Sequence, residues 1–595
     1  MRYVCFLFLL IFSSGSLFSQ QDILAKQYLD EGAFEKALSM YQVLYREMPT
    51  QIDFFQKIIL CHQQLEQYDK AEVLLKEKLE NPNVSPLYYI ELGYNFQLQE
   101  QTDEAAKYYD KAIGKLQDIP TYAYLIGYTF QQKSLLDYAV RSYKEGLELA
   151  PSQNLHLNLA RVYGEMGDIE EMFNTYLDLI VLNPESQRAV VSGIYPFLTM
   201  DYSGVNVSIL RRQLIKRSQE TADIVWNELL SWLFVQQQQY GQAFLQERAI
   251  YKRSGETTIS RLEELAAVAM DGGDRDNARI IYEFIVANAY DPEPLINAKL
   301  KLLTLNLENV SPTVVERSYI EFKELYEQYG DSPFGWHLEI EYGNFLAYYK
   351  GDFASANRLL KAGIERVRPR RHQAQLKMTL AAILVFYEHF NEALIYYSQV
   401  QKDFKNDVLG QEARFKIAQT SFYKGDFRWA ENQLDVLKSS TSQLIANDAL
   451  QLKLLISDNS LQDSLKTALK LYAKADLLAL QKKTDQAIAV LDEILANHKG
   501  ESIEDEALFK QAQLFENQSK YDLAQSNYLK ILEYFNGDIL SDDALFHLAK
   551  LYEGELGEPN KALELYERIL LGHPDSIFYV EARKNYRKLR GDDIN

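Results

Sequence analysis

Small and aromatic residues recur along this chain in a fixed order, with polar residues between them. The stretch DEGAFEKALSMYQVLYREMP, residues 30–49, carries Gly32, Ala37, Tyr41 and Pro49. The alanines of four successive stretches follow one another at a constant spacing of about 34 residues, a period typical of paired helices that stack on one another: Ala37, Ala71, Ala105 and Ala139. Each pair has an apolar face that it cannot bury alone, so the pattern predicts an all-α α-solenoid of helix–turn–helix repeats.

The repeat continues toward the C-terminus with a longer period. Its alanines lie slightly farther apart than those of the N-terminal stretches, within two runs: Ala356, Ala393 and Ala430, then Ala487, Ala524 and Ala562. Slightly longer helices or loops would produce this spacing. The final segment, IFYVEARKNYRKLRGDDIN, is charged and amphipathic, which predicts one helix that caps the solenoid with a polar outer face.

This pattern resembles the tetratricopeptide repeat family. The residues that carry the resemblance in one repeat are Ile126, Gly127, Phe130, Ala139, Tyr143, Gly146 and Pro151. Small residues such as Gly93, Ala105, Gly127 and Ala139 would let two helices cross closely, while tyrosine and phenylalanine fill the gaps between repeats. The resemblance covers most of residues 22–590. It implies that the first helix of each repeat lines a concave groove that holds partner segments.

Variation in the pattern predicts how the chain is organised. Residues 1–19 are expected to be a signal peptide, and residues 20–184 an N-terminal block of about five repeats. Matches are weak over residues 185–258, which contain the broken stretch IYPFLTMDYSGVNVS and are expected to form an irregular helical joint. A C-terminal repeat block then covers residues 259–575, and a capping helix covers residues 576–595.

The N-terminal sequence MRYVCFLFLLIFSSGSLFSQQ has the order of a secretory signal. Arg2 precedes nine apolar residues, Val4–Phe12, and small residues follow as far as Ser19. Nine apolar residues are too few to span a bilayer, although a buried N-terminal helix stays as an alternative. The Ser-Gln ending resembles secretory signals of Bacteroidota. Because Cys5 stands too early for a lipobox cysteine, the expected product is exported, soluble and periplasmic, without a lipid anchor or a transmembrane segment.

Charge and composition restrict the classes of partner. The chain has 84 acidic and 63 basic residues and a formal net charge of −21, so it repels nucleic-acid phosphates and anionic lipids. With Cys5 in the signal, Cys61 is left alone, cannot form an intramolecular disulfide and is expected in the core. The chain has no HExxH, GxxxxGK[ST], GxGxxG, GxSxG or CxxC motif, so no metal, cofactor or catalytic residue is predicted.

The groove positions of the family fall on aromatic and amide residues of the N-terminal block. Carried over by their place in the repeat, they are Tyr94, Gln97, Tyr124, Tyr128, Gln131, Asn154 and Arg161. Aromatic rings bury apolar area and amides pair with a peptide backbone, so this set favours an extended peptide or a short helix as ligand. The alternative is that some of these tyrosines pack between repeats.

A basic cluster interrupts the acidic background of the C-terminal block. The stretch ERVRPRRHQ carries Arg366, Arg368, Arg370 and Arg371 around a proline, at a corner between repeats. One hypothesis is a contact with an anion, such as an acidic patch of a partner or a surface polysaccharide. The other is that the arginines complement the C-terminal dipole of a helix, and this second interpretation is favoured.

These observations favour a non-enzymatic scaffold in the periplasm of a Gram-negative bacterium, binding proteins of envelope assembly, secretion or motility. The last ninety or so residues weakly resemble repeat modules of envelope-assembly factors, which would allow peripheral association with an envelope complex. One rival hypothesis is a carbohydrate-handling accessory protein with tyrosines as sugar platforms. The other is an enzyme with dispersed carboxylates, although acidic residues on a helical surface are more often solvated.

Overall fold

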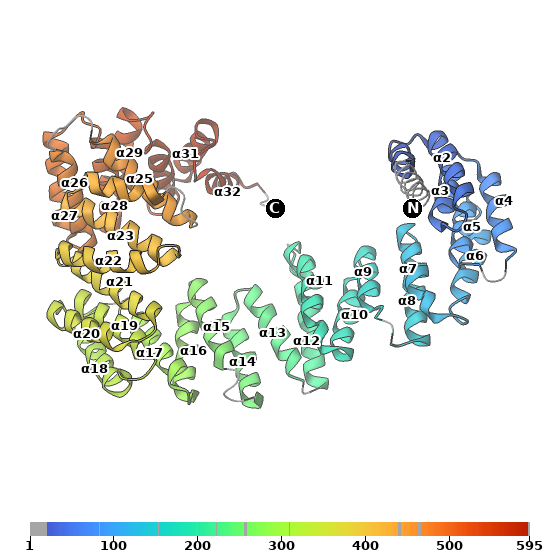
Figure 1. Ribbon diagram of the computed structural model, residues 1–595, viewed down its shortest axis with the longest axis horizontal. Coiled ribbons are helices and arrows are strands. Elements are labelled where there is room, and N and C mark those ends of the chain that lie inside the picture. Colours follow the sequence, from blue (N-terminus) through green and yellow to red (C-terminus); the bar gives the residue numbers. More distant parts are fainter. Residues whose placement is uncertain are drawn as a thin grey trace, which may run out of the picture. The chain divides into compact units, whose positions relative to one another are not determined.

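The structure of the 595-residue chain is a computed structural model. It describes residues 21–81, 84–152, 154–201, 203–221, 223–254, 259–308, 310–437, 442–460 and 466–592. These residues form helices joined by turns and short loops (Figure 1), which confirms the all-α solenoid. The expected signal peptide, residues 1–19, lies outside the described residues. Within the described ranges, none of the helices combines the length and the apolar character needed to cross a membrane.

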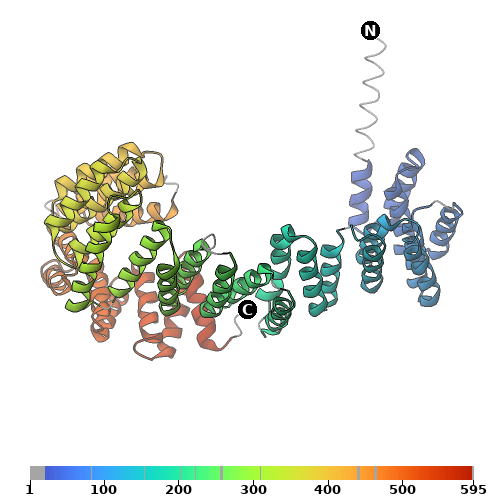
Figure 2. The same cartoon turned by 90° about the horizontal axis from the view of Figure 1, so that it is seen from below.

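The chain divides into two compact units, residues 1–258 and 259–595. The helices of the first unit are 21–30, α2 (Phe34–Glu47), α3 (Ile52–Gln64), α4 (Tyr68–Leu79), α5 (Leu87–Gln97), α6 (Thr102–Gly114), α7 (Ala123–Gln132), α8 (Leu136–Leu149), α9 (His156–Met166), α10 (Ile169–Leu182), α11 (Gln187–Thr199), α12 (Val205–Glu220), α13 (Ile224–Gln236) and α14 (Tyr240–Ser254). Short 3₁₀ turns lie at Pro120–Tyr122 and Pro184–Ser186. Each odd-numbered helix from α5 to α9 packs on the next helix in the chain, and these pairs succeed one another along the unit (Figure 2).

Small residues lie where the two helices of a pair cross, as the sequence predicted. Ala105 and Ala139 are buried. A Cβ atom on Gly93 would lie 2.6 Å from the Tyr109 ring, and one on Gly127 would lie 2.5 Å from the Tyr143 ring. The tyrosine of the second helix therefore occupies the space that a glycine of the first helix leaves open. Cys61 is buried, as expected of a core residue.

The turn within a helix pair places one residue in the left-handed region of backbone space. Between α7 and α8 this residue is Ser134 (φ 57°), and between α9 and α10 it is Gly167 (φ 78°). Glycine adopts this conformation without a steric cost, and serine adopts it here at the same point of the repeat. Lys133 and Met166, which directly precede these residues, therefore occupy equivalent positions in two successive repeats.

Residues 185–258, the expected joint, contain helices α11 to α14. The helices α13 and α14 pack as a close pair, and Asn227 of α13 accepts a hydrogen bond from Arg253 of α14 (2.9 Å). The pair α11 and α12 is less regular, because α11 contains Pro196, which has no N–H for the helix ladder. The irregularity seen in the sequence therefore belongs to one helix pair within the first unit.

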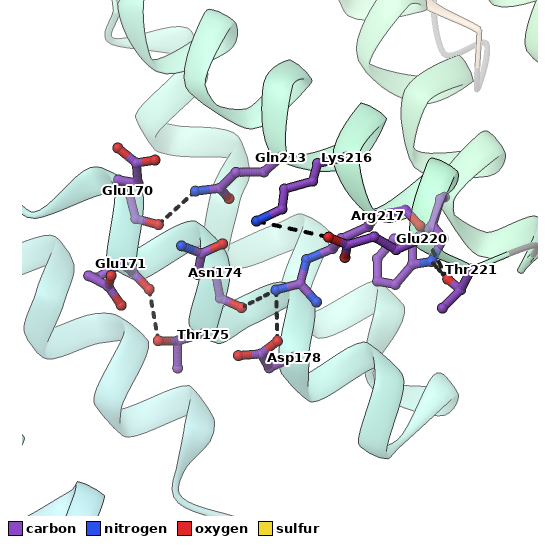
Figure 3. A network of polar contacts seen from close by, with 11 residues as sticks. Glu170, Glu171, Asn174, Thr175, Asp178, Gln213, Lys216, Arg217, Glu220 and Thr221 are labelled. Carbon is purple, nitrogen blue, oxygen red and sulfur yellow. Dashed lines mark hydrogen bonds and ion pairs between the residues drawn. The ribbon is translucent and has the colours of Figure 1, made fainter.

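Helix α12 packs against α10 through polar side chains (Figure 3). Gln213 donates its amide to the Glu170 carbonyl (2.9 Å). Arg217 donates to the Asn174 carbonyl (3.3 Å) and to the Asp178 carboxylate (2.7 Å). These contacts connect α12 to the helix before α11, so they hold the unit together where the regular repeat pattern weakens.

The second unit begins at α15 and ends at α32. Its helices are α15 (Ile259–Asp271), α16 (Arg275–Asn288), α17 (Pro292–Asn306), α18 (Pro312–Tyr329), α19 (Gly335–Tyr348), α20 (Phe353–Arg366), α21 (Arg370–Phe386), α22 (Phe390–Asp403), α23 (Val408–Lys424), α24 (Phe427–Leu437), α25 (Gln443–Asp458), α26 (Thr467–Leu480), α27 (Thr484–Asn497), α28 (Glu504–Asn517), α29 (Tyr521–Tyr534), α30 (Ser541–Glu553), α31 (Pro559–Gly572) and α32 (Tyr579–Arg590).

Helix α25 departs from the alternation of paired helices. It packs on α24, whereas the following helix α26 pairs with α27 and also contacts α23. This additional helix explains why the core alanines Ala430 and Ala487 lie farther apart than one repeat. At the end of the unit, α32 packs on α31 and buries Ala582, while most of its remaining residues are charged or polar.

Candidate functional site

The first helices of three successive repeats carry six of the seven expected groove residues. Tyr94 and Gln97 lie on α5, Tyr124 and Tyr128 lie on α7 with Gln131, and Arg161 lies on α9. Asn154 does not lie on a first helix, because α9 begins only at His156. The preceding helix, α8, ends at Leu149, so Asn154 lies between the two helices. The expectation that Asn154 belongs to the helical groove face is therefore wrong.

Buried tyrosines of the second helices send their hydroxyl groups toward the ends of the first helices. Tyr109 donates to the Gln97 side chain, 12 residues earlier, at 2.7 Å. In the second unit Tyr528 donates to Glu516, also 12 residues earlier (2.5 Å), and Tyr566 donates to Glu553 (3.0 Å). Gln97, at the end of the first helix, therefore also links the two helices of its repeat.

Tyr143 departs from this arrangement. Its ring is buried, but its hydroxyl has no hydrogen-bond partner among the described residues. Gln131, the counterpart of Gln97 in this repeat, instead donates its amide to Glu165 of α9 at 2.5 Å. Burial raises the pKa of Tyr143 above its ordinary value, and the nearby Tyr124, Glu165 and Tyr128 add to this rise. An unpaired hydroxyl therefore lies close to the predicted groove residues of α7.

Tyr94 has its ring covered from within the chain. The Lys133 ammonium lies 4.2 Å from the ring centroid and 3.0 Å from a carboxylate oxygen of Glu91. The Lys133 and Glu91 side chains are only 14% and 9% exposed. A cation over an aromatic face and beside a carboxylate is attracted to both, and more strongly where water is excluded. The Tyr94 ring and the Glu91 carboxylate of α5 are therefore both engaged by Lys133 of the next repeat.

Tyr124 and Tyr128 are the most open of the predicted tyrosines. Their rings are nearly parallel, with centroids 5.9 Å apart and an interplanar angle of 10°. Tyr124 is 49% exposed and Tyr128 is 44% exposed. Residues four apart share one face of a helix, which explains why the two rings stack. Together they present aromatic surface to solvent, with the Gln131–Glu165 hydrogen bond one turn farther along.

Arg161 of α9 is exposed and lies near Tyr176 of α10. Burial raises the pKa of Tyr176, while the nearby Arg161 opposes this rise. Arg161 lies one helical turn before Glu165, so the groove face of α9 carries one basic and one acidic group.

The four arginines of the basic cluster have different surroundings. Arg366 ends α20 and forms ion pairs with Glu339 (2.5 Å) and Asp331 (3.0 Å). The Glu339 side chain is 1% exposed, and burial raises the pKa of Glu339 to about 7 while Arg366 opposes this rise. Arg371 pairs with Asp407 (3.0 Å), whereas Arg368 and Arg370 are exposed. Arg366 therefore serves the chain's own buried carboxylate.

A groove in the second unit was missed from the sequence. It has a volume of about 320 Å³ and crosses three successive first helices, α19, α21 and α23. Its lining residues are Trp336, His337, Ile340, Gln375, Met378, Thr379, Leu409 and Glu412. Trp336 stacks on His372 with ring centroids 4.1 Å apart, and burial lowers the pKa of His337.

A sequence signal for this groove existed. Ile340 and Met378 each stand three positions before the small residue of a first helix, Gly343 or Ala381. This shared offset from the small residue identifies the same face of the first helices in the second unit from the sequence alone. The lining combines the Trp336 ring and aliphatic side chains with an imidazole, an amide, a hydroxyl and one carboxylate, so it offers both apolar area and hydrogen-bonding groups.

Within the described residues, no group of three or more histidine, cysteine, aspartate or glutamate side chains is arranged to hold a metal ion. Residues 543–576 match the family model of the tetratricopeptide repeat. This segment contains nearly all of α30 and the whole of α31, so one tetratricopeptide repeat coincides with an observed helix pair. A search of curated proteins found no match.

Two solved structures with tetratricopeptide-like solenoids are similar at low sequence identity. One is described as the structure of Naa15/Naa10 bound to HypK-THB, with 13% identity, 96% of each chain covered and a TM-score of 0.29. The other is the crystal structure of the APC/C hetero-tetramer Cut9-Hcn1, with 12% identity, 96% of each chain covered and a TM-score of 0.22. TM-scores this low do not indicate a common arrangement of the whole chain.

Proposed function

We propose that the protein is a non-enzymatic scaffold that binds segments of partner proteins along the first helices of its solenoid. The observation that carries this proposal is the stacked, half-exposed pair Tyr124 and Tyr128 on α7. Exposed rings bury apolar area when a partner docks, and the neighbouring Gln131 amide can hydrogen-bond to a peptide backbone. The neighbouring helix pairs supply a rigid frame, because their own tyrosines are buried in the crossings.

We further propose the setting in which this scaffold acts. The apolar N-terminal sequence supports export to a bacterial periplasm of the Bacteroidota type, and a mature chain that starts near Gln20. The resemblance of the C-terminal repeats supports a role in envelope assembly, secretion or motility, with peripheral attachment to an envelope complex. Arg368 and Arg370 remain exposed for contact with an acidic partner surface, whereas Arg366 and Arg371 are paired within the chain.

Partner capture with a matched set of variants tests the proposed function. The full exported protein is immobilised, exposed to envelope extract, and its retained proteins are identified by mass spectrometry. The affinity of the purified partner is then measured by calorimetry for wild type, for Tyr124→Ala with Tyr128→Ala, and for Tyr534→Ala. Tyr534 is an exposed tyrosine of a second helix, α29, and serves as the control.

The double variant is expected to lose about 2 kcal/mol of binding free energy, about 30-fold in Kd, while the control binds like wild type. Its helical content should be unchanged, because both rings are half-exposed. Unchanged affinity of the folded double variant would contradict the proposal. Retention of polysaccharide instead of protein would favour the carbohydrate-handling alternative.

A further inference from the structure

On α5, an aromatic ring and a carboxylate together bind a lysine side chain of the same protein. Lys133 extends from the end of α7 over the Tyr94 ring, with its ammonium 4.2 Å from the ring centroid. The Glu91 carboxylate holds the same ammonium at 3.0 Å. Ring and carboxylate act together, because each attracts the cation and burial strengthens both attractions.

The next repeat offers a ring at the same position without the chain's own cation. Tyr128 stands one repeat after Tyr94, at the equivalent position of α7. The position equivalent to Lys133 is occupied by Met166, which is 40% exposed. In the described part of the chain, no lysine or arginine lies over the ring of Tyr124 or Tyr128. Glu165, the residue before Met166, is an exposed carboxylate bonded to the neutral amide of Gln131.

The unpaired hydroxyl of Tyr143 is a second, independent observation at this repeat. The equivalent Tyr109 donates to Gln97, and Tyr528 and Tyr566 also donate to acceptors near the ends of their first helices. At Tyr143 the corresponding acceptor, Gln131, is held by Glu165 instead. A buried hydroxyl without a partner is destabilising, so a ligand that takes over Glu165 and frees Gln131 for Tyr143 gains from the new hydrogen bond.

We propose that the surface formed by Tyr124, Tyr128, Glu165 and Met166 binds an arginine or lysine side chain of an extended partner segment. The partner's cation lies over the tyrosine rings and pairs with Glu165, as Lys133 does with Tyr94 and Glu91. Gln131 then leaves Glu165 and turns its carbonyl oxygen to accept from Tyr143. The inference rests on the proposed function and adds the chemical class of the partner.

Charge and shape favour arginine over other side chains at this surface. The chain carries a net charge of −21, which attracts a basic segment. A planar guanidinium stacks on aromatic rings and binds a carboxylate with two parallel hydrogen bonds. The aliphatic part of the side chain can lie against the exposed Met166. Arg161, the basic group on the same face of α9, acts on Tyr176 of its own repeat.

Two matched peptides test the inference on the full-length protein. The probe is a fluorescein-labelled, glycine- and serine-rich nonapeptide with two arginines, and its control carries citrulline at both positions. Citrulline has nearly the same shape and hydrogen-bonding capacity but no charge. Binding is followed by fluorescence anisotropy at low salt. The arginine peptide should bind about tenfold more tightly than the citrulline peptide.

Single substitutions place the peptide on the protein. Glu165→Gln removes the charge, and Met166→Lys gives Tyr128 the internal cation that Tyr94 already has. Each should weaken the arginine peptide about fivefold or more, to near the affinity of the citrulline peptide. Glu145→Gln is the matched control, because Glu145 lies on the second helix α8 and likewise accepts an amide hydrogen bond, from Gln117 (2.8 Å). It should leave binding unchanged.

The inference is overturned if the two peptides bind equally, if neither binds up to about 1 mM, or if Met166→Lys leaves binding unchanged. Circular dichroism of each variant establishes that it is folded. Loss of the natural partner in the Tyr124→Ala, Tyr128→Ala variant, without selectivity for arginine, would reject this inference and retain the proposed function. Arginine selectivity with an unaffected natural partner would reject the proposed function for that partner.

Discussion

The repeats α5–α6 and α7–α8 have the same skeleton but differ on the face of their first helices. In both, a glycine of the first helix admits the tyrosine of the second, Gly93 with Tyr109 and Gly127 with Tyr143. In the first repeat the hydroxyl of Tyr109 is paired. In the second repeat the hydroxyl of Tyr143 is unpaired. The difference indicates that the helix crossing is the same in both repeats while the contacts on the face of the first helix are set by single positions.

Lys133 and Met166 are the clearest of these single positions. Each directly precedes the left-handed residue of its turn, so the two side chains start from equivalent backbone positions in successive repeats. Lysine at this position covers Tyr94 and satisfies Glu91. Methionine carries no charge, and both Met166 and Tyr128 are exposed, at 40% and 44%. On the proposed function, exchange of this one side chain would decide which repeat presents its tyrosine to a partner.

The largest expected effect comes from removing the internal cation. Lys133→Ala leaves the nearly buried Glu91 carboxylate without its partner, so the free energy of opening of α5 and α7 should fall by about 3 kcal/mol. Met166→Ala, at the equivalent position, should cost less than about 1 kcal/mol. Native-state hydrogen exchange of the amides in these helices measures both values. Equal effects would mean that the two positions are not distinguished by charge pairing.

A smaller and equal effect is expected at the two helix crossings. Gly93→Ala and Gly127→Ala each bring a Cβ atom to within 2.6 Å or less of a tyrosine ring, so each should destabilise its repeat by about 2 kcal/mol. The same exchange experiment provides the values. Similar losses would support a common helix crossing in the two repeats, whereas a loss confined to one repeat would contradict it.

The smallest effect separates the two hydroxyl groups. Tyr109→Phe removes a hydrogen bond to Gln97 and should cost about 1 kcal/mol. Tyr143→Phe removes a buried hydroxyl that has no partner, so stability should be unchanged or slightly higher. Thermal unfolding of the two variants beside wild type gives the comparison. A clear loss of stability in Tyr143→Phe would show that its hydroxyl is paired in solution.

The fold could be predicted because its determinants recur in the sequence. Ala105 and Ala139 mark the crossings at a fixed period, and their burial follows from the need to bring two helices close together. The exposed pair Tyr124 and Tyr128 was found in the same way, from its place in the repeat. The additional helix α25 was not predicted, because nothing in its sequence repeats the pattern of its neighbours.

The missed features depend on contacts between residues that no repeat pattern connects. Arg366 was read as one member of a basic cluster, but its partner Glu339 is a buried carboxylate on the preceding helix of the pair. Asn154 was assigned to the first helix from its distance along the repeat, but α9 begins only at His156, so Asn154 lies before the helix. The unpaired hydroxyl of Tyr143 depends on which way Gln131 turns, which only three-dimensional contacts determine.

Photo-cross-linking tests the central claim most directly, namely that the open repeat is the one that binds. A benzoylphenylalanine replaces the residue at position 128, at the equivalent position 94, or at position 73, which is exposed on the second helix α4. The partner identified by capture is added, and each protein is irradiated. The account predicts strong cross-linking from position 128, weak cross-linking from position 94 and none from position 73. Cross-linking from position 94 or 73 that equals that from position 128 would contradict it.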